Sequence, residues 1–160
     1  MKERTILRER LFICNMDENL RKKTDELIQQ LSRDNVDFEQ YIQENQDSLI
    51  AVNLRDFWSA LIKRTGMSNS DIINKSEMSY YYFYEVINGK NVPSVDKIVS
   101  LILATHLTLE DCQTALKYCG KAPLYPKLLR DSVFIYAITH ELTLSETNKL
   151  LVQSGLDKLK

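Results

Sequence analysis

The sequence predicts an all-α protein, and three observations support this fold class. Only four Gly and three Pro occur among 160 residues, which favours helices over a sandwich or barrel because the chain has few breakpoints. Apolar residues recur at helical spacing through the middle of the chain. A Ser, Thr or Asn followed three residues later by an acid, a pattern typical of a helix N-terminus, occurs repeatedly. No segment requires a strand.

Residues 1–50 are expected to form an N-terminal helical extension. Two thin apolar stripes with helical spacing occur within residues 17–48: Leu20, Leu27, Ile28 and Leu31, then Phe38, Tyr41 and Ile42. Because this stretch is highly charged, it predicts one or two surface helices that lean on the core or on a partner. Met16, followed by Asp17 as a candidate N-cap, is an alternative start of the protein, and the mass of the native protein would decide between the two.

Residues 51–106 are expected to form a second, four-helix domain. Its first helix has one buried face formed by Leu54, Phe57, Trp58, Leu61 and Ile62. Asn53 and Asp56 are its N-terminal cap and Gly66 ends it.

Three shorter helices are expected to follow within the same domain. Ser68 and Asp71 cap the first of them, and a break at 75–77 separates it from the next. That helix runs from about Ser79 to Asn88 and stops at Gly89, because Gly accepts a left-handed conformation without steric cost. Pro93 and Ser94 begin the last, whose core residues are Ile98, Val99, Leu101 and Ile102.

Residues 107–160 contain an internal repeat. The segment LTLEDCQTALKYCG at 107–120 aligns without gaps to LTLSETNKLLVQSG at 142–155. Each copy has a Thr cap with an acid three residues later and closes on a Gly. A very apolar helix over 128–139 lies between them, after the turn formed by residues 123–126. The repeat predicts two similar helical units that pack on each other and on the preceding domain.

Composition excludes several classes of function. No apolar run approaches the roughly 18–20 residues that span a bilayer, and the N-terminus lacks the apolar core of a signal peptide, so we expect a cytoplasmic protein. Cys14, Cys112 and Cys119 have no disulfide or zinc spacing, and reduced thiols are expected. The acids are dispersed, and no nucleotide-binding or nucleophile motif occurs. We therefore expect neither an enzyme nor a cofactor or metal.

Residues 67–94, MSNSDIINKSEMSYYYFYEVINGKNVPS, carry a recognisable pattern. A capped short helix, a turn, a second helix, then Asn-Gly-Lys and Pro-Ser follow one another without a gap. This order resembles the Xre, or lambda-repressor-like, helix-turn-helix family over roughly residues 53–110. The flanking helices resemble those of a subgroup of these regulators from Gram-positive bacteria.

The resemblance implies binding of double-stranded DNA, with the second helix in the major groove. The residues facing the groove would be Ser79, Tyr80, Tyr81, Tyr84 and Glu85. The residues near phosphates would be Asn69, Ser70, Lys90 and Asn91. The residues facing inward would be Met78, Phe83, Val86 and Ile87.

The sequence also departs from the family pattern. Glu77 stands where the family has Gly in the turn, which implies a left-handed non-Gly residue. Ile73 and Ile87 replace the usual Ala and Glu. The recognition helix has no Arg or Lys to pair with guanine. The net charge is −1, and residues 51–106 carry 6 basic and 5 acidic side chains, although Lys and Arg supply most affinity for DNA.

Two functions therefore remain open. The first is a sequence-specific transcriptional regulator that binds DNA as a homodimer through its apolar 128–159 region. The second is a protein–protein interaction module, encoded by a phage or mobile element in one version, that keeps the fold without binding DNA. It would use its tyrosine cluster or its N-terminal helices to contact a partner.

Overall fold

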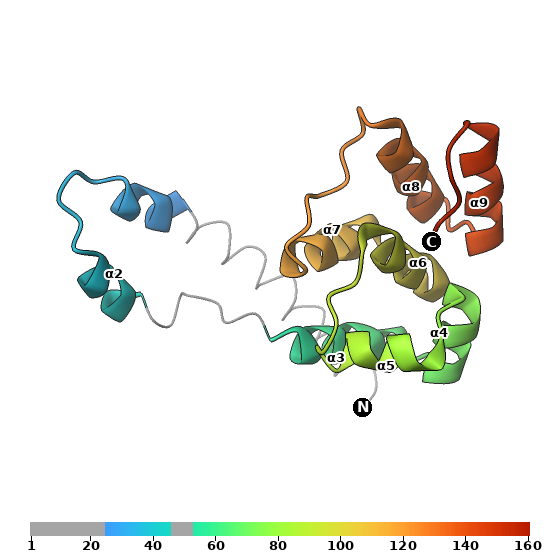
Figure 1. Ribbon diagram of the computed structural model, residues 1–160, viewed down its shortest axis with the longest axis horizontal. Helices are drawn as coiled ribbons and strands as arrows, with labels where there is room; N and C mark the ends of the chain where they lie inside the picture. The colour runs from blue at the N-terminus through green and yellow to red at the C-terminus, as the bar shows by residue number, and fades with distance from the viewer. Residues whose placement is uncertain (1–24, 46–52) are drawn as a thin grey trace. The chain divides into compact units, whose positions relative to one another are not determined.

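The computed structural model describes residues 25–45 and 53–160, and all regular structure within them is α-helical (Figure 1). This confirms the all-α class for these residues. The chain divides after Val52 into two units, which are described separately below. Residues 53–160 form one compact unit, which contains both the four-helix segment and the repeat segment distinguished in the sequence.

The described part of the first unit is a pair of short helices. Residues 25–31 are helical, residues 32–37 turn, and α2 spans Phe38–Glu44. The Asp37 carboxylate caps α2 by accepting hydrogen bonds from the backbone N–H groups of Glu39 and Gln40. Tyr41 is buried, whereas Ile28, Leu31 and Phe38 are exposed. The expectations for Cys14, Met16, Asp17 and Leu20 lie outside the described residues.

Four helices begin the second unit: α3 Leu54–Thr65, α4 Asn69–Ser76, α5 Tyr80–Ile87 and α6 Val95–Thr105. Each begins after a side-chain cap, because Asn53, Ser68, Ser79 and Ser94 accept a hydrogen bond from the backbone N–H three residues later. The caps at Asn53, Ser68 and Ser94 were predicted, whereas Ser79 was expected to be the first residue of its helix. Gly66 ends α3 in the left-handed conformation, as predicted. One boundary is wrong: α4 continues to Ser76, because the turn begins only at Glu77.

Three further helices complete the second unit: α7 Leu109–Tyr118, α8 Leu129–Thr139 and α9 Leu144–Gln153. Both predicted Thr caps are reciprocal capping boxes. Thr108 and Asp111 exchange side-chain-to-backbone hydrogen bonds at the start of α7, and Thr143 and Glu146 do the same at the start of α9. The two copies of the sequence repeat therefore begin with the same local structure.

The structural repeat is longer than the sequence repeat. It consists of two helical hairpins, α6–α7 and α8–α9, offset by 35 residues. The backbone N–H of Leu107 donates to Ile102, and 35 residues later that of Leu142 donates to Ala137. The left-handed residues that end α6 and α8, His106 and Glu141, are also counterparts. Helix α6 contacts α8 and α9, and α7 contacts α8, so the two hairpins pack on each other.

Helix α6 lies at the centre of the second unit (Figure 1). It packs against α4, α7, α8 and α9, and every residue from Ile98 to Thr105 is buried. Trp58 of α3 is also fully buried, which confirms its core placement. A buried ion pair joins α3 to α7, because Arg64 contacts the Asp111 carboxylate.

The chain end packs against the second hairpin and α6. The Arg130 guanidinium contacts Asp96 at 2.8 Å and donates to the Asp157 carbonyl at 2.7 Å. The Asp96 carboxylate also accepts from the backbone N–H of Lys160. These bonds connect α6, α8 and the C-terminal residues.

Candidate nucleic-acid interface

A three-residue turn from Glu77 to Ser79 joins α4 to α5. Glu77 has a φ of 54°, the left-handed conformation that the sequence implied. Met78 is buried beneath the turn. Because Ser79 caps α5, the first turn of that helix begins directly at the tyrosine cluster. Helix α3 packs against α5, and α4 packs against α6, so both helices of the pair are held from behind.

Helix α5 has a buried face and an exposed face. Met78, Phe83 and Val86 are buried, as predicted. Ile87 is only half-buried, because α5 ends there and its last turn reaches the edge of the core. Tyr80 is 66% exposed and Tyr81 is 82% exposed. Two large aromatic rings are therefore exposed to solvent at the start of a short helix.

The exposed face of α5 contains an open hollow of about 200 Å³. Its lining residues are Tyr80, Tyr81, Tyr84, Glu85, Asn88 and Lys90. Five of these six were predicted site residues, and the sixth, Asn88, was predicted only to stop the helix. The fold therefore brings the predicted tyrosines and Lys90 around one hollow. Ser79 is exposed at the N-terminal end of the same helix.

Contacts between side chains orient two of the tyrosines. The rings of Tyr80 and Tyr84 lie 4.6 Å apart between centroids. The Asn69 side-chain amide donates to the Tyr84 hydroxyl at 3.3 Å, which ties α5 to the first residue of α4. Tyr84 is half-buried. Tyr81 has the largest exposure among the exposed large apolar side chains of the described residues.

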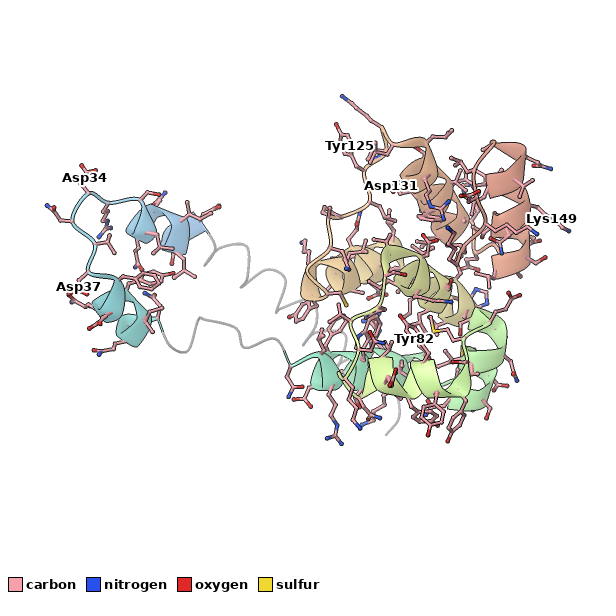
Figure 2. The ribbon with its side chains drawn as sticks, viewed as in Figure 1. Asp34, Asp37, Tyr82, Tyr125, Asp131 and Lys149 are labelled. Carbon is pink, nitrogen blue, oxygen red and sulfur yellow. The ribbon has the colours of Figure 1, made fainter. Side chains whose placement is uncertain are left out.

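Tyr82 faces the other way, toward α6 (Figure 2). It is half-buried, and the Lys97 ammonium lies 5.9 Å from its ring centroid. Burial raises the pKa of the Tyr82 phenol, and a backbone hydrogen bond with Ser94 partly offsets this effect. Tyr82 therefore belongs to the packing of α5 on α6 and not to the exposed face.

The four residues expected near phosphates differ in accessibility. Ser70 and Lys90 are exposed, whereas Asn69 and Asn91 are half-buried. Asn69 already uses its amide to hold Tyr84. The backbone N–H groups of Lys90 and Asn91 both donate to the Glu85 carbonyl, at 2.9 and 3.2 Å. The chain after α5 is therefore folded back tightly, and Lys90 projects beside the hollow.

Sequence reasoning missed Arg55, an exposed cation near the C-terminal end of α5. A Cβ atom placed on Gly89 would lie 3.0 Å from the backbone nitrogen of Arg55. The close approach of α3 to this turn requires Gly there, in addition to its positive φ of 71°. Arg55 and Lys90 therefore come from distant parts of the sequence to the same end of α5. No local pattern in the sequence signals this proximity.

Other chemistry is limited in the described residues. Cys112 and Cys119 are buried free thiols, as predicted, and burial raises their pKa to about 12 and about 11. Both are protonated at neutral pH and are therefore poor nucleophiles. Within residues 25–45 and 53–160, His, Cys, Asp and Glu form no group of three that could hold a metal ion.

Comparisons with protein-family models, curated proteins and solved structures find no match to this chain. In the part of the chain that the structure describes, no helix has the length and apolar character needed to cross a membrane.

Proposed function

We propose that the chain is a sequence-specific regulator of the Xre helix-turn-helix type that binds double-stranded DNA as a dimer. In this proposal α4 braces the DNA backbone and α5 enters the major groove. The observation that carries it is the open aromatic face of α5. Tyr80, Tyr81 and Glu85 are exposed there, and Phe83 and Val86 anchor the opposite side of the helix in the core.

Tyrosine suits such a surface in two ways. Its ring can contact a thymine methyl in the major groove, and its hydroxyl can donate to a phosphate oxygen. Tyr81 is free to do either, because its ring is almost entirely on solvent. Glu85, one helical turn further along the hollow, can accept a hydrogen bond from the N4 amino group of cytosine.

In this proposal, cations near the end of α5 attract the phosphates of the DNA. The backbone of Arg55 approaches Gly89, the residue before Lys90, at the C-terminal end of the helix, and both cations are exposed. The exposed Ser70 lies in the first turn of α4, where backbone N–H groups and the helix dipole attract a phosphate. Residues 53–160 carry 13 basic and 11 acidic side chains, so this unit lacks the negative balance of residues 1–50.

A second function, a protein-binding module, is favoured by two observations. Helix α5 carries no Arg or Lys, and two exposed tyrosines with a neighbouring hollow also suit a buried hot spot at a protein interface. The dependence of binding affinity on salt concentration distinguishes the two functions. Binding to DNA weakens steeply with added salt because counterions are released, whereas an aromatic protein interface responds little.

The test is a fluorescence-anisotropy titration of the full chain with a random-sequence duplex at two salt concentrations. We expect the affinity to fall roughly tenfold or more between about 50 and about 200 mM salt. Lys90→Gln should reduce the slope of log affinity against log salt by about 1. Lys149→Gln, an exposed lysine on α9 (Figure 2), is the matched control and should leave the slope unchanged. Absence of binding at about 50 mM salt contradicts the DNA-binding proposal.

A further inference from the structure

Tyr84 is the tyrosine of the α5 hollow whose side chain is held by three contacts. Its ring meets the fully buried Phe83 ring edge-on, at 5.4 Å between centroids, and lies 4.6 Å from the Tyr80 ring. Its hydroxyl accepts the 3.3 Å hydrogen bond from the Asn69 side-chain amide. Tyr81, in contrast, is 82% exposed. Tyr84 is therefore held in one orientation before any ligand binds.

The hydrogen bond with Asn69 leaves the Tyr84 hydroxyl with a proton to donate. A phenol hydroxyl has one proton, and its oxygen can also accept. Because the Asn69 amide is the donor in their contact, the proton of Tyr84 stays available. Among residues 25–45 and 53–160, no acceptor takes this proton. Tyr84 also lines the open hollow, so its donor is available to a molecule bound against α5.

The contacts of Asn69 differ from those that the sequence resemblance implied. The resemblance places this residue beside a phosphate, but its side chain is half-buried and its amide is engaged with Tyr84. This hydrogen bond joins the first residue of α4 to the second turn of α5. Asn69 thus determines where the Tyr84 hydroxyl lies, because the side chain that holds it belongs to the other helix of the pair.

We propose that Tyr84 donates a hydrogen bond to an acceptor atom of the bound DNA, and that Asn69 is the positioning residue for its hydroxyl. This inference rests on the proposed function, because it adds a contact between α5 and DNA. The acceptor is a base atom in the major groove, such as guanine O6 or thymine O4, or a phosphate oxygen. Since α5 carries no Arg or Lys, a hydroxyl fixed in position gives the helix a directed donor.

The first test compares the wild type with Tyr84→Phe, which removes the hydroxyl and keeps the ring. The probes are a random-sequence duplex and an enriched duplex, which the wild type has selected from random double-stranded DNA. We expect Tyr84→Phe to bind the enriched duplex about fivefold more weakly, the effect of one hydrogen bond. A base acceptor leaves the affinity for the random duplex unchanged, whereas a phosphate acceptor lowers both affinities equally. Tyr125→Phe, at an exposed tyrosine outside α5, is the matched control and should bind both probes as the wild type does.

A double-mutant cycle tests whether Asn69 acts through Tyr84. Asn69→Ala is expected to weaken binding to the enriched duplex by no more than Tyr84→Phe does. The double variant should bind no more weakly than Tyr84→Phe alone, because without the hydroxyl the Asn69 amide has nothing to position. A residue that contacted a phosphate by itself, or that served only to stabilise the fold, would add its own loss to that of Tyr84→Phe.

The contact between the two residues can also be measured without DNA. Nuclear Overhauser effects between the Asn69 amide protons and the Tyr84 ring protons are expected in the free wild type, and their absence contradicts the positioning role. Equal binding of the enriched duplex by Tyr84→Phe and the wild type, or losses that add in the double variant, overturns the inference and leaves the DNA-binding proposal standing. A wild type that binds neither duplex contradicts the proposed function, and the inference fails with it.

Discussion

The hairpins α6–α7 and α8–α9 share a backbone plan but differ in their surroundings. Both have a left-handed residue before a Thr capping box and a second helix that closes on Gly. The first hairpin is surrounded by neighbours, and its capping acid Asp111 is buried beside Arg64. In the second hairpin the counterpart acid, Glu146, is exposed. The same local structure is therefore buried in one copy of the repeat and exposed in the other.

Substitutions of the two capping acids are expected to give the largest difference in stability between the hairpins. Asp111→Asn leaves the largely buried Arg64 side chain, 10% exposed, without its partner and should lower the free energy of unfolding by about 3–5 kcal/mol. Glu146→Gln changes an exposed acid and should cost far less at neutral pH. Chemical denaturation of both variants measures the contrast, and a similar small loss in both would show that the first hairpin is not the buried one.

One of these two capping acids, Glu146, also makes the stability of the fold depend on pH. Hydrogen bonds from the backbone and hydroxyl of Thr143 hold the pKa of Glu146 below its usual value near 4.5. Because the folded-state pKa is lowered, this contribution to stability is present above about pH 4.5 and is lost as pH falls through the folded value. Denaturation between neutral pH and about pH 3 should show a smaller acid loss for Glu146→Gln than for the wild type. An identical acid loss in the two proteins would contradict the bonded carboxylate.

The next contrast is between counterpart positions in the first helices of the hairpins. Leu101→Ala opens a cavity in a buried site and should cost about 2–5 kcal/mol. Tyr136→Ala removes a half-exposed ring and should cost less than about 1 kcal/mol at concentrations where the chain is monomeric. Urea denaturation at submicromolar concentration compares them. Equal costs would mean that α8 is buried as deeply as α6.

The smallest effect is expected to be equal in both hairpins. His106 and Glu141 have φ values of 52° and 53°, which non-Gly residues adopt at a cost. His106→Gly and Glu141→Gly should each stabilise the fold by about 0.5–1 kcal/mol after the greater chain entropy of Gly in the unfolded state is included. Thermal denaturation measures both, and a loss of stability in either would show that the native side chain makes a compensating contact.

The local part of this fold could be predicted from the sequence. The caps at Asn53, Ser68 and Ser94 depend on a side chain and a backbone N–H three residues apart, so the sequence contains them directly. The inward and outward faces of α5 were expected from the resemblance to the helix-turn-helix family. The left-handed conformation of Glu77 was expected because the helix-turn-helix family that the chain resembles has Gly at this position.

The non-local part could not be predicted. The ion pair of Arg64 with Asp111 and the approach of Arg55 to Gly89 depend on how α3 packs, which no local pattern specifies. The first helices of the hairpins share few identical residues, so the alignment of the second helices did not extend to them. Counterpart core positions, such as Val99 and Phe134, share only their apolar character, because each side chain fills the space left by different neighbours.

The most direct test of the central proposal is a selection from random double-stranded DNA at near-physiological salt. The wild type would be compared with a Tyr80→Ala, Tyr81→Ala double variant and with Tyr125→Ala, a matched exposed tyrosine outside α5. We predict an enriched motif of two inverted halves for the wild type and Tyr125→Ala, and its loss in the double variant. A folded wild type that enriches no motif, or a double variant that enriches the same one, would contradict DNA recognition through α5.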